Sequence, residues 1–274
     1  MIGSSTTPTL PFGVNTLGEL IPMTMTVHRQ NPAVDSDVAV SRGRVRSATI
    51  EAENLLQDLG AIPVINSDAM GMGRIGELVR RTWQLASRRL AGPGAAAPAG
   101  QHADNERVLR YLAKLTINPA LAHGLADHVG SLEPGKLADV VLWHPAFFGA
   151  KPELVLKSGF VAWGVSGDGA GSTRLGQPRK YRPYFGGLGD APASLAAIFV
   201  AASALEHGFA RKLPGRRLLA VRGTRHIRRS DMLHNIATPR VEVPTDGTPV
   251  RVNGAAVHVD PVTWVPLGQL YHLA

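Results

Sequence analysis

A single carboxylate, Asp68, is the first feature of the sequence with a recognisable chemical use. It follows the apolar run at residues 62–65 and precedes a glycine-punctuated turn and a helical pattern from Ile75. The β-branched run predicts a strand buried on both faces, and the later spacing predicts an amphipathic helix. A carboxylate at the end of a parallel strand can bind a metal ion or hold a proton, as in α/β barrels. Capping of the following helix is the second reading, and spacing alone leaves both open.

A histidine and an arginine in the first 46 residues are the other candidates for chemistry. That stretch carries four prolines and few long apolar runs, which predicts a long loop with short helical pieces. Loops of this length inside compact domains are usually lids or binding segments. His28 lies within it, and Arg44 belongs to the alternating set Arg42, Arg44 and Arg46. A lone loop histidine is more often a surface residue than a catalyst, so the pattern alone gives His28 no role.

The elements that must position these residues follow from periodicity and turn signals. The turn Asn253-Gly254 between alternating segments predicts a hairpin. The Pro/Gly-rich stretch at residues 92–102 predicts a surface insertion, and the GDGAG run at residues 167–171 lacks the Lys and helix of a phosphate loop. We expect helices at residues 47–59, 74–90, 106–115, 116–124 and 193–209, and strands at residues 62–65, 218–221 and 241–243.

Composition and charge set the broad class of the protein. The chain has 274 residues, 44% of them hydrophobic, and no cysteine, which predicts one large or two modest globular domains. Without cysteine, a metal site must use His, Asp, Glu or a modified side chain. There is no signal-peptide pattern and no run of about 18 apolar residues, so we expect a soluble, cytoplasmic protein without membrane contact.

The net charge of +8 raises the question of a nucleic-acid partner. The arginines occur in separate pairs, such as Arg80-Arg81 and Arg216-Arg217, without interleaved aromatic residues or a recognition-helix pattern. We therefore expect a solvated basic surface and no nucleic-acid partner.

The most specific motif is GSLEPGKLADVVLW at residues 130–143, which follows NPA at residues 118–120. This pattern resembles the end of the barrel in the metal-dependent amidohydrolase superfamily. Within that superfamily, nearly the whole chain resembles the nickel-containing catalytic (alpha) subunits of ureases. The resembling segments are SSTTPTLPFGVNTLGE at residues 4–19, DVAVSRGRVRSATIEAENLLQDLGA at 37–61, NSDAMGMGRIGELVRRTWQ at 66–84, residues 109–159, YRPYFGGLG at 181–189 and SDMLHN at 230–235.

The resemblance implies an α/β fold, the C-terminal fragment of an amidohydrolase TIM-type (β/α)8 barrel plus part of a small composite β-domain. Residues 1–137 correspond to the end of the barrel with an active-site flap at about residues 17–46. Residues 138–190 correspond to the β-domain segment, and residues 191–274 to a C-terminal helix and strands that pack on the barrel. Family members are roughly twice as long, so we expect only the eighth barrel strand to be securely present.

The resemblance also implies roles for three residues. Asp68 matches the carboxylate that binds one nickel ion at the end of strand eight. His28 matches the first histidine of the mobile flap, a general acid that closes over urea, and Arg44 matches the flap arginine that orders it. The family binds two nickel ions in each complete site, and this chain supplies only Asp68 as a ligand. Further implied partners are the missing N-terminal half, the urease beta and gamma subunits and a trimeric assembly.

Several positions depart from the family pattern. Val27 and Arg29 replace a flap cysteine and the second histidine of a pair, and residues 69–71 read Ala-Met-Gly in place of Ser-Gln-Ala. Two readings follow. The chain hydrolyses urea to ammonia and carbamate when the missing half completes it, or it is a truncated, non-catalytic relative. In both cases we expect the isolated chain to be inactive and to hold no nickel pair, because most ligands are absent.

Overall fold

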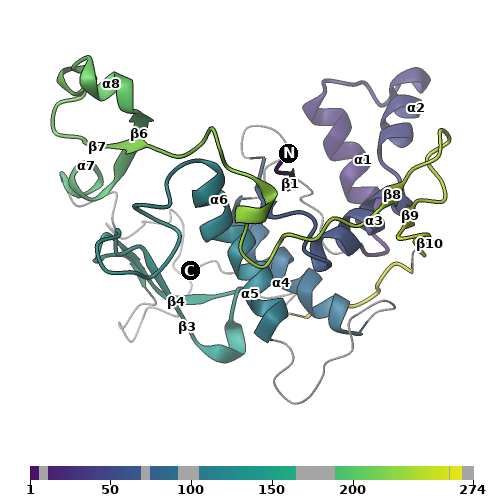
Figure 1. The fold of residues 1–274 in the computed structure, drawn as a ribbon. Helices are drawn as coiled ribbons and strands as arrows, with labels where there is room; N and C mark the ends of the chain where they lie inside the picture. The colour runs from purple at the N-terminus through teal and green to yellow at the C-terminus, as the bar shows by residue number, and fades with distance from the viewer. Residues whose placement is uncertain (6–11, 69–74, 92–104, 165–188, 259, 267–274) are drawn as a thin grey trace, which may run out of the picture. The chain divides into compact units, whose positions relative to one another are not determined.

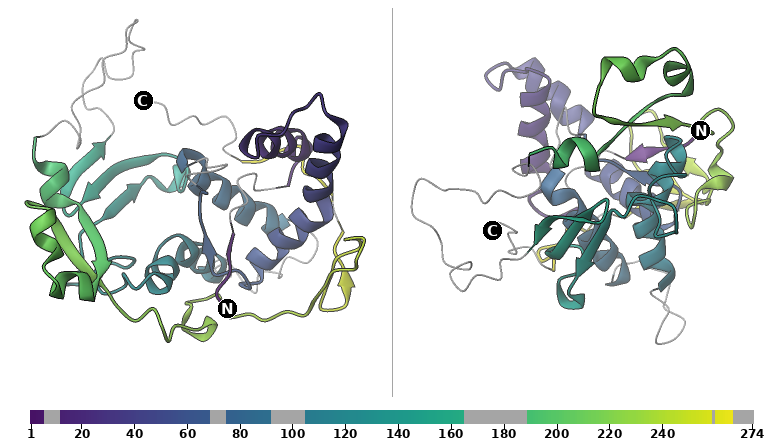
Figure 2. Two further views of the ribbon diagram at one scale, coloured as in Figure 1. Left: turned by 90° about the horizontal axis from the view of Figure 1, so that it is seen from above. Right: turned by 90° about the vertical axis from the view of Figure 1, so that its left-hand side faces the viewer.

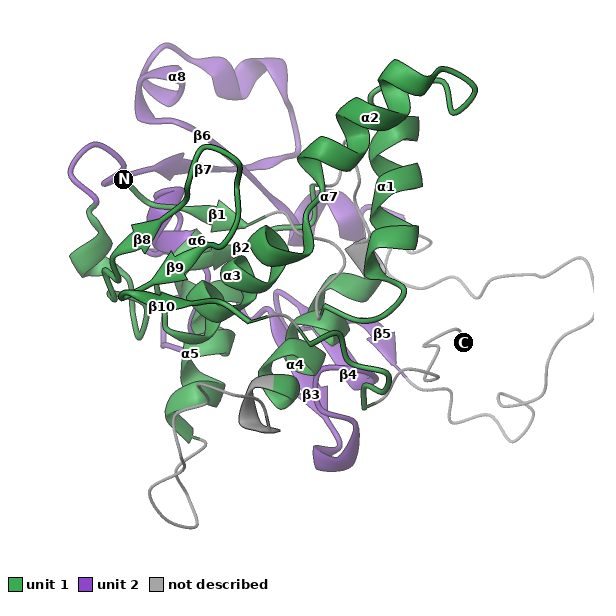
Figure 3. Cartoon of the chain, turned by 90° about the vertical axis from the view of Figure 1, so that its right-hand side faces the viewer, with its two compact units in different colours: residues 1–119, 228–268 green, residues 120–227, 269–274 purple. Residues whose placement is uncertain are grey.

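The chain folds into two compact units of mixed α/β structure. Unit 1 contains residues 1–119 and 228–268, and unit 2 contains residues 120–227 and 269–274 (Figure 3). The computed structural model describes residues 1–5, 12–68, 75–91, 105–164, 189–258 and 260–266 (Figure 1). The predicted insertion at residues 92–102 and the GDGAG run lie outside these residues.

Unit 1 contains a pair of short parallel strands. β1 (Ser4–Ser5) pairs with β2 (Val64–Ile65), and both residues of β2 are buried. The expected strand at residues 62–65 is two residues shorter, because the carbonyl groups of Ile62 and Pro63 bond to side chains in place of a neighbouring strand. The burial on both faces is as expected, and no closed barrel occurs among the residues that the structure describes.

The helices around β2 agree closely with the sequence predictions. α3 (Ser47–Asp58) precedes the strand, and α4 (Ile75–Ala91), α5 (Asn105–Leu115) and α6 (Ile117–Ala122) follow it. An apolar cluster joins Ile65 of β2 to Leu85 of α4 and Tyr111 of α5, and Trp83 stacks obliquely on Tyr111 at 6.5 Å. Helical periodicity is a reliable signal for α4 and α5 because one face of each of these two helices meets this cluster.

In the first 46 residues the structure has two regular helices, where a long loop with short helical pieces was predicted. α1 (Thr16–Val27) and α2 (Asp35–Arg44) are helices of 12 and 10 residues that lie side by side (Figures 1 and 2). Residues four apart, Thr16, Leu20 and Thr24, form the buried stripe of α1. Two of the three are threonine, so the stripe is weak in a hydrophobicity pattern although it is continuous in the fold. We call this pair of helices and the turn between them the flap.

A small antiparallel sheet completes unit 1. Its order is β10 (Ala255–Ala256), β9 (Arg251–Val252) and β8 (Val241–Glu242). Asn253 and Gly254 join β9 to β10 with φ of +51° and +82°, the left-handed conformation that a two-residue hairpin turn requires. The predicted hairpin is confirmed.

The described part of unit 2 contains two separate sheets (Figure 2). β3 (Val140–Trp143), β4 (Pro152–Lys157) and β5 (Phe160–Gly164) form an antiparallel sheet, with the 3-10 turn η1 (Pro145–Phe147) before β4. Asp139 closes the β4–β5 turn by accepting hydrogen bonds from the Lys157 ammonium at 2.6 Å and the Ser158 N–H at 2.9 Å. β-Structure in this unit begins at Val140, and the domain boundary after residue 137 stays a prediction.

The second sheet of unit 2 shows that the predicted helix at residues 193–209 is wrong. In its place are α7 (Ala191–Leu195), β6 (Ala197–Ala201), α8 (Ala202–Glu206) and the 3-10 helix η3 (Phe209–Lys212). The consecutive residues Ile198, Phe199 and Val200 favour a strand, and they pair in parallel with β7 (Arg217–Val221). A 3.6-residue pattern happened to run through the same segment, and tertiary pairing decided the outcome.

No helix in the described parts of the chain is both long and apolar enough to cross a membrane.

Candidate active site

Asp68 lies directly beyond the carboxyl end of β2, on a turn fixed by the neighbouring strand. Its backbone N–H donates to Oδ1 of Asn66 at 3.0 Å, which closes a local turn. The Asn66 N–H donates to the Ser5 carbonyl at 2.8 Å, and the Asn66 amide also donates to the hydroxyl of Ser4. Asp68 has a φ of +49°, a left-handed conformation that Asp tolerates better than most residues. The carboxylate is therefore held at the edge formed by two parallel strands.

The described residues do not decide between the two readings of Asp68. An N-cap residue directly precedes the first helical residue, and residues 69–74, between Asp68 and the described start of α4 at Ile75, lie outside the described residues. The bonds above support a position at the strand end and leave capping open. Residues 69–71, where the sequence departs from the family pattern, are among those outside the described residues.

His28 is placed by the end of α1. The Gln30 N–H donates to the Met25 carbonyl at 2.9 Å, and the Arg29 N–H donates to the Thr26 carbonyl at 3.2 Å. These two bonds form a Schellman motif, in which the residue after the C-cap adopts a left-handed conformation. Arg29 occupies that position with a φ of +55°, where glycine is usual. The motif ends the helix at His28 and holds the histidine backbone in place.

The imidazole of His28 has a defined tautomer when it is neutral. Its Nδ1 lies 2.8 Å from the Thr24 carbonyl oxygen. A carbonyl oxygen only accepts hydrogen bonds, so Nδ1 carries a hydrogen and Nε2 is the nitrogen that gains or loses a proton. The side chain is exposed, so Nε2 is open to a reacting group. The arrangement is that of an imidazole anchored on one side and available on the other.

Arg44 lies at the opposite end of the flap from His28. It is the last residue of α2, and its side chain is exposed. α2 has 10 residues and therefore rises about 15 Å, which separates the two positions along the flap. Within the described residues no hydrogen bond joins Arg44 to His28. The flap brings the two residues into one structural element but does not place them side by side.

The flap is anchored at its base. Leu20 of α1 packs with Phe12 and Ile50 in a second apolar cluster, and Arg81 of α4 lies 3.6 Å from Glu19 of α1. On α2 the only buried residue is Ser41, whose hydroxyl donates to the side chain of Gln30. The body of unit 1 therefore holds the start of α1, whereas α2 packs mainly on α1.

A metal pair does not fit the donor set that the structure describes. No group of three or more His, Asp or Glu side chains is gathered anywhere in the described residues. Asp68 offers one carboxylate, which suits a single coordination position of nickel or another divalent ion. The remaining ligands of any such site have to come from elsewhere.

Polar residues that sequence reasoning did not single out hold the segment before β2. Asn118 is fully buried, and its amide donates to the carbonyl groups of Pro63 and Leu233, both at 3.1 Å. Its Oδ1 accepts the Leu233 N–H at 2.8 Å. Arg229 donates to the Ala61 carbonyl at 2.7 Å. Asn118 lies in the NPA motif, so the motif marks a structural anchor of the candidate site.

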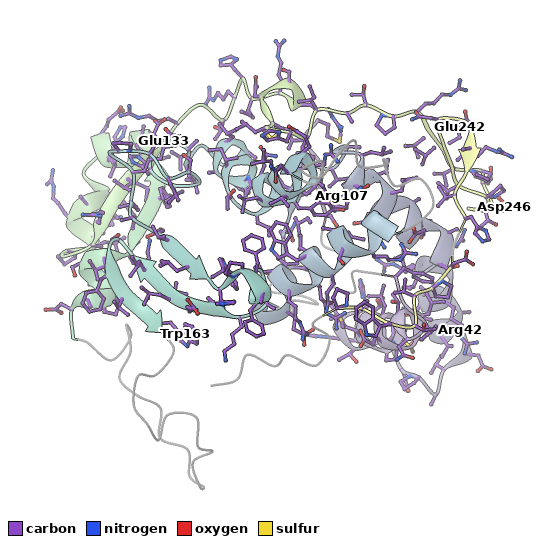
Figure 4. The ribbon with its side chains drawn as sticks, turned by 90° about the horizontal axis from the view of Figure 1, so that it is seen from below. Arg42, Arg107, Glu133, Trp163, Glu242 and Asp246 are labelled. Carbon is purple, nitrogen blue, oxygen red and sulfur yellow. The ribbon has the colours of Figure 1, made fainter. Side chains whose placement is uncertain are left out.

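Buried charges flank the same segment. Arg107 of α5 binds Asp58 of α3 through two nitrogens, at 2.9 and 3.3 Å. Its side chain lies among the helices of unit 1 (Figure 4). The fully buried Lys114 donates from Nζ to the Ile62 carbonyl. Burial lowers the pKa of Lys114 well below its usual value, and the Arg110 charge lowers it further while Asp58 opposes the shift.

Comparison with known proteins gives two findings. The sequence pattern of the family described as "Amidohydrolase family" matches residues 3–178. "Urease subunit alpha 1" of Streptomyces avermitilis is 50% identical over 273 residues, which cover 100% of this chain and 48% of that protein. The chain thus spans about half the length of the curated relative that it matches. These findings confirm the resemblance seen in the sequence.

Proposed function

Because this chain belongs to the amidohydrolase family, and because it resembles a urease alpha subunit along its whole length, we propose that it forms one part of a nickel-dependent urease active site. The observation that carries the proposal is the position of Asp68 at the carboxyl end of β2, on a turn tied to β1. A missing N-terminal half supplies the other strands and the other metal ligands. The substrate is urea, and the products are ammonia and carbamate.

In this proposal the chain contributes one ligand and one acid. In a completed site the Asp68 carboxylate would hold one coordination position of a nickel ion. The bound metal would supply the activation of the water that attacks the urea carbon. Protonated His28 donates the Nε2 proton to the departing nitrogen while its Nδ1–H remains on the Thr24 carbonyl. Arg44 helps to order the flap over the substrate.

The wider assembly is part of the same proposal. Residues 1–137 form the end of the barrel with the flap, residues 138–190 form part of the β-domain, and residues 191–274 pack on the barrel. The partners are the missing half, the beta and gamma subunits and a trimeric assembly. A cytoplasmic location agrees with the absence of cysteine.

A truncated, non-catalytic relative is the second candidate. Two observations favour it: Val27 and Arg29 replace flap residues of the family pattern, and Asp68 is a single ligand.

Complementation separates the two candidates. We would express this chain together with the part of the Streptomyces avermitilis relative that it does not cover, add nickel, and measure bound nickel and ammonia release. The first candidate predicts a complex that retains nickel and hydrolyses urea, loses nickel in Asp68→Ala, and slows about 100-fold in His28→Ala with its nickel retained. A nickel-loaded complex that is inactive would establish the second candidate. Activity that is indifferent to His28→Ala would remove the flap histidine from the mechanism.

A further inference from the structure

The positive charge of this chain is concentrated in one stretch. Residues 207–230 contain eight of the 29 Lys and Arg residues and none of the 21 Asp and Glu residues. The other residues therefore carry equal numbers of both signs, and the net charge of +8 belongs to this stretch. The arginine pairs occur along the whole sequence and do not reveal this stretch by themselves. The stretch stands out because it contains no Asp or Glu to balance its Lys and Arg residues.

Six of these cations lie in unit 2, around β7. All six side chains are exposed, and none has an ion-pair partner among the described residues. Of the other two, Arg229 is engaged in unit 1 through its bonds to the carbonyl groups of Ala61 and Ala237. We call the six residues the basic rim: Arg211, Lys212, Arg216, Arg217, Arg222 and Arg225.

The basic rim lies on β7 and on the segments that flank it in sequence, next to apolar side chains that unit 2 covers poorly. β6 and β7 form a sheet of only two strands, which is marginal without further packing. No residue of either strand is buried in the structure. Ile198 of β6 is 38% exposed opposite the half-buried Leu218 of β7. The two strands therefore carry partly exposed apolar side chains, and the exposed cations lie on β7 and on the segments that flank it.

We propose that β6 and β7, with the basic rim, form a docking surface for an acidic protein partner. An apolar centre with a charged rim is the usual anatomy of a protein–protein interface, in which Arg is enriched and Lys depleted. The rim contains five Arg and one Lys. An acidic partner would neutralise the positive charge of the rim and would also cover the exposed side chain of Ile198.

Other polyanions fit less well. Residues 207–230 contain one aromatic residue of the Phe, Tyr and Trp class, Phe209, and so offer no series of rings on which successive bases would stack. A nucleic-acid backbone would neutralise the rim but leave the apolar centre uncovered. A membrane surface would require an amphipathic helix, whereas α8 has only five residues. The proposal gives a partner to the solvated basic surface that the composition predicted, and it does not depend on urea hydrolysis.

The test compares two probes on the purified full-length chain. The first is a short fluorescent peptide of alternating Glu and Leu, which offers both acidic and apolar side chains, and the second is a duplex DNA of similar charge. We expect the peptide to bind more tightly than the duplex, with an affinity that falls at least about 10-fold between low and physiological salt. Tighter binding of the duplex would make the surface a nucleic-acid site and overturn the proposal. So would a peptide affinity that is insensitive to salt.

Variants separate the two contributions to binding. Ile198→Ser is expected to weaken peptide binding about fivefold and to leave any duplex binding unchanged, because only the peptide uses the apolar centre. An unchanged peptide affinity would overturn the proposal. The charge test uses the triple variant Arg216→Glu, Arg217→Glu and Arg222→Glu, with Arg42→Glu, Lys151→Glu and Arg240→Glu as a control that changes the net charge equally.

We expect the rim variant to lose peptide affinity by about 10-fold or more and the control to change it less than about threefold. Equal losses in both would show that binding follows total charge, and would overturn the proposal. Circular dichroism checks that each variant is folded. If the rim variant unfolds, we would replace the same three arginines by lysine, which keeps their charge. A retained, salt-dependent peptide affinity in this variant supports the rim. Loss of peptide affinity in a folded lysine variant would contradict a mainly electrostatic contribution.

Discussion

The two units of this chain differ sharply in how much they bury. Unit 1 encloses two apolar clusters together with buried charged and amide side chains, among them Asp58, Arg107 and Asn118. In the described part of unit 2 the buried residues are two alanines and two glycines. A set of strands can be well paired and still lack a core, because hydrogen bonds along the strands do not remove side chains from water. Unit 1 is expected to carry most of the stability of the chain, and unit 2 to gain stability from partners.

The buried ion pair of unit 1 provides the largest expected effect. Asp58→Ala leaves the Arg107 guanidinium without its carboxylate in a buried site, and we expect a loss of about 3–5 kcal/mol in the free energy of unfolding. Urea denaturation followed by circular dichroism measures it. Arg240→Ala removes an exposed ion pair to Glu242 and serves as the control, with an expected change below about 1 kcal/mol. Similar losses in both variants would mean that burial does not distinguish the pairs.

Matched leucine truncations test the comparison most directly. Leu85 of α4 is fully buried in unit 1, and Leu218 of β7 is half-buried in unit 2. Leu85→Ala is expected to cost about 2–5 kcal/mol because it leaves a cavity, whereas Leu218→Ala is expected to cost less than about 1.5 kcal/mol. Denaturant melts of the two variants give the difference. A larger loss at Leu218 would show that unit 2 has a core of its own.

The buried Lys114 makes the stability of unit 1 depend on pH. Its pKa in the folded protein is lowered from 10.5, so between the lowered value and 10.5 the unfolded chain binds a proton that the folded chain does not. The free energy of unfolding should therefore rise with pH across that window. Below the window the buried Lys114 is charged, and the full cost of burying that charge lowers the free energy of unfolding. Melting at a series of alkaline pH values shows the slope. Lys114→Met should remove this slope, and a slope of equal size in the variant would assign it to other groups.

The flap gives the smallest expected effect. Arg29 holds a left-handed conformation at the end of α1 that glycine adopts without strain. Arg29→Gly is expected to raise the free energy of unfolding by about 0.5–1 kcal/mol. The control is Gly18→Ala, inside α1, which changes helix propensity without changing the end of the helix. A destabilised Arg29→Gly variant would mean that the arginine side chain contributes more than its backbone conformation costs.

The sequence predicted those parts of the fold whose signal is local. The helices around β2, the Asn253-Gly254 hairpin and the place of Asp68 at a strand end all follow from periodicity and turn residues within about ten positions. The helix expected at residues 193–209 failed because β6 is decided by pairing with β7, which lies about 20 residues later. Tertiary pairing of this kind overrides local propensity and leaves no trace in a short window.

The candidate site divides in the same way. Asp68 and His28 were recognisable as residue types at particular positions, and the resemblance supplied their roles. The Asn66 turn, the Schellman motif at Arg29 and the Asn118 anchor were not predictable, because each depends on which backbone group comes within reach in the folded chain. The roles of His28, Arg44 and Asp68 in hydrolysis stay predictions until complementation tests them.

The bonds between Asn118 and Leu233 have a consequence for the order in which the protein matures during translation. They join residues 115 positions apart, and Arg229 reaches Ala61 across 168 positions. At about 5–20 residues per second, Leu233 is synthesised about 6–23 s after Asn118. During that interval the residues of β2 and of its neighbouring helices are already synthesised, but Arg229 and Leu233 are not. A ribosome-bound chain that stops short of residue 229 therefore lacks the Arg229 bond to the Ala61 carbonyl and the bonds between Asn118 and Leu233, which hold the segment before β2 in the finished protein.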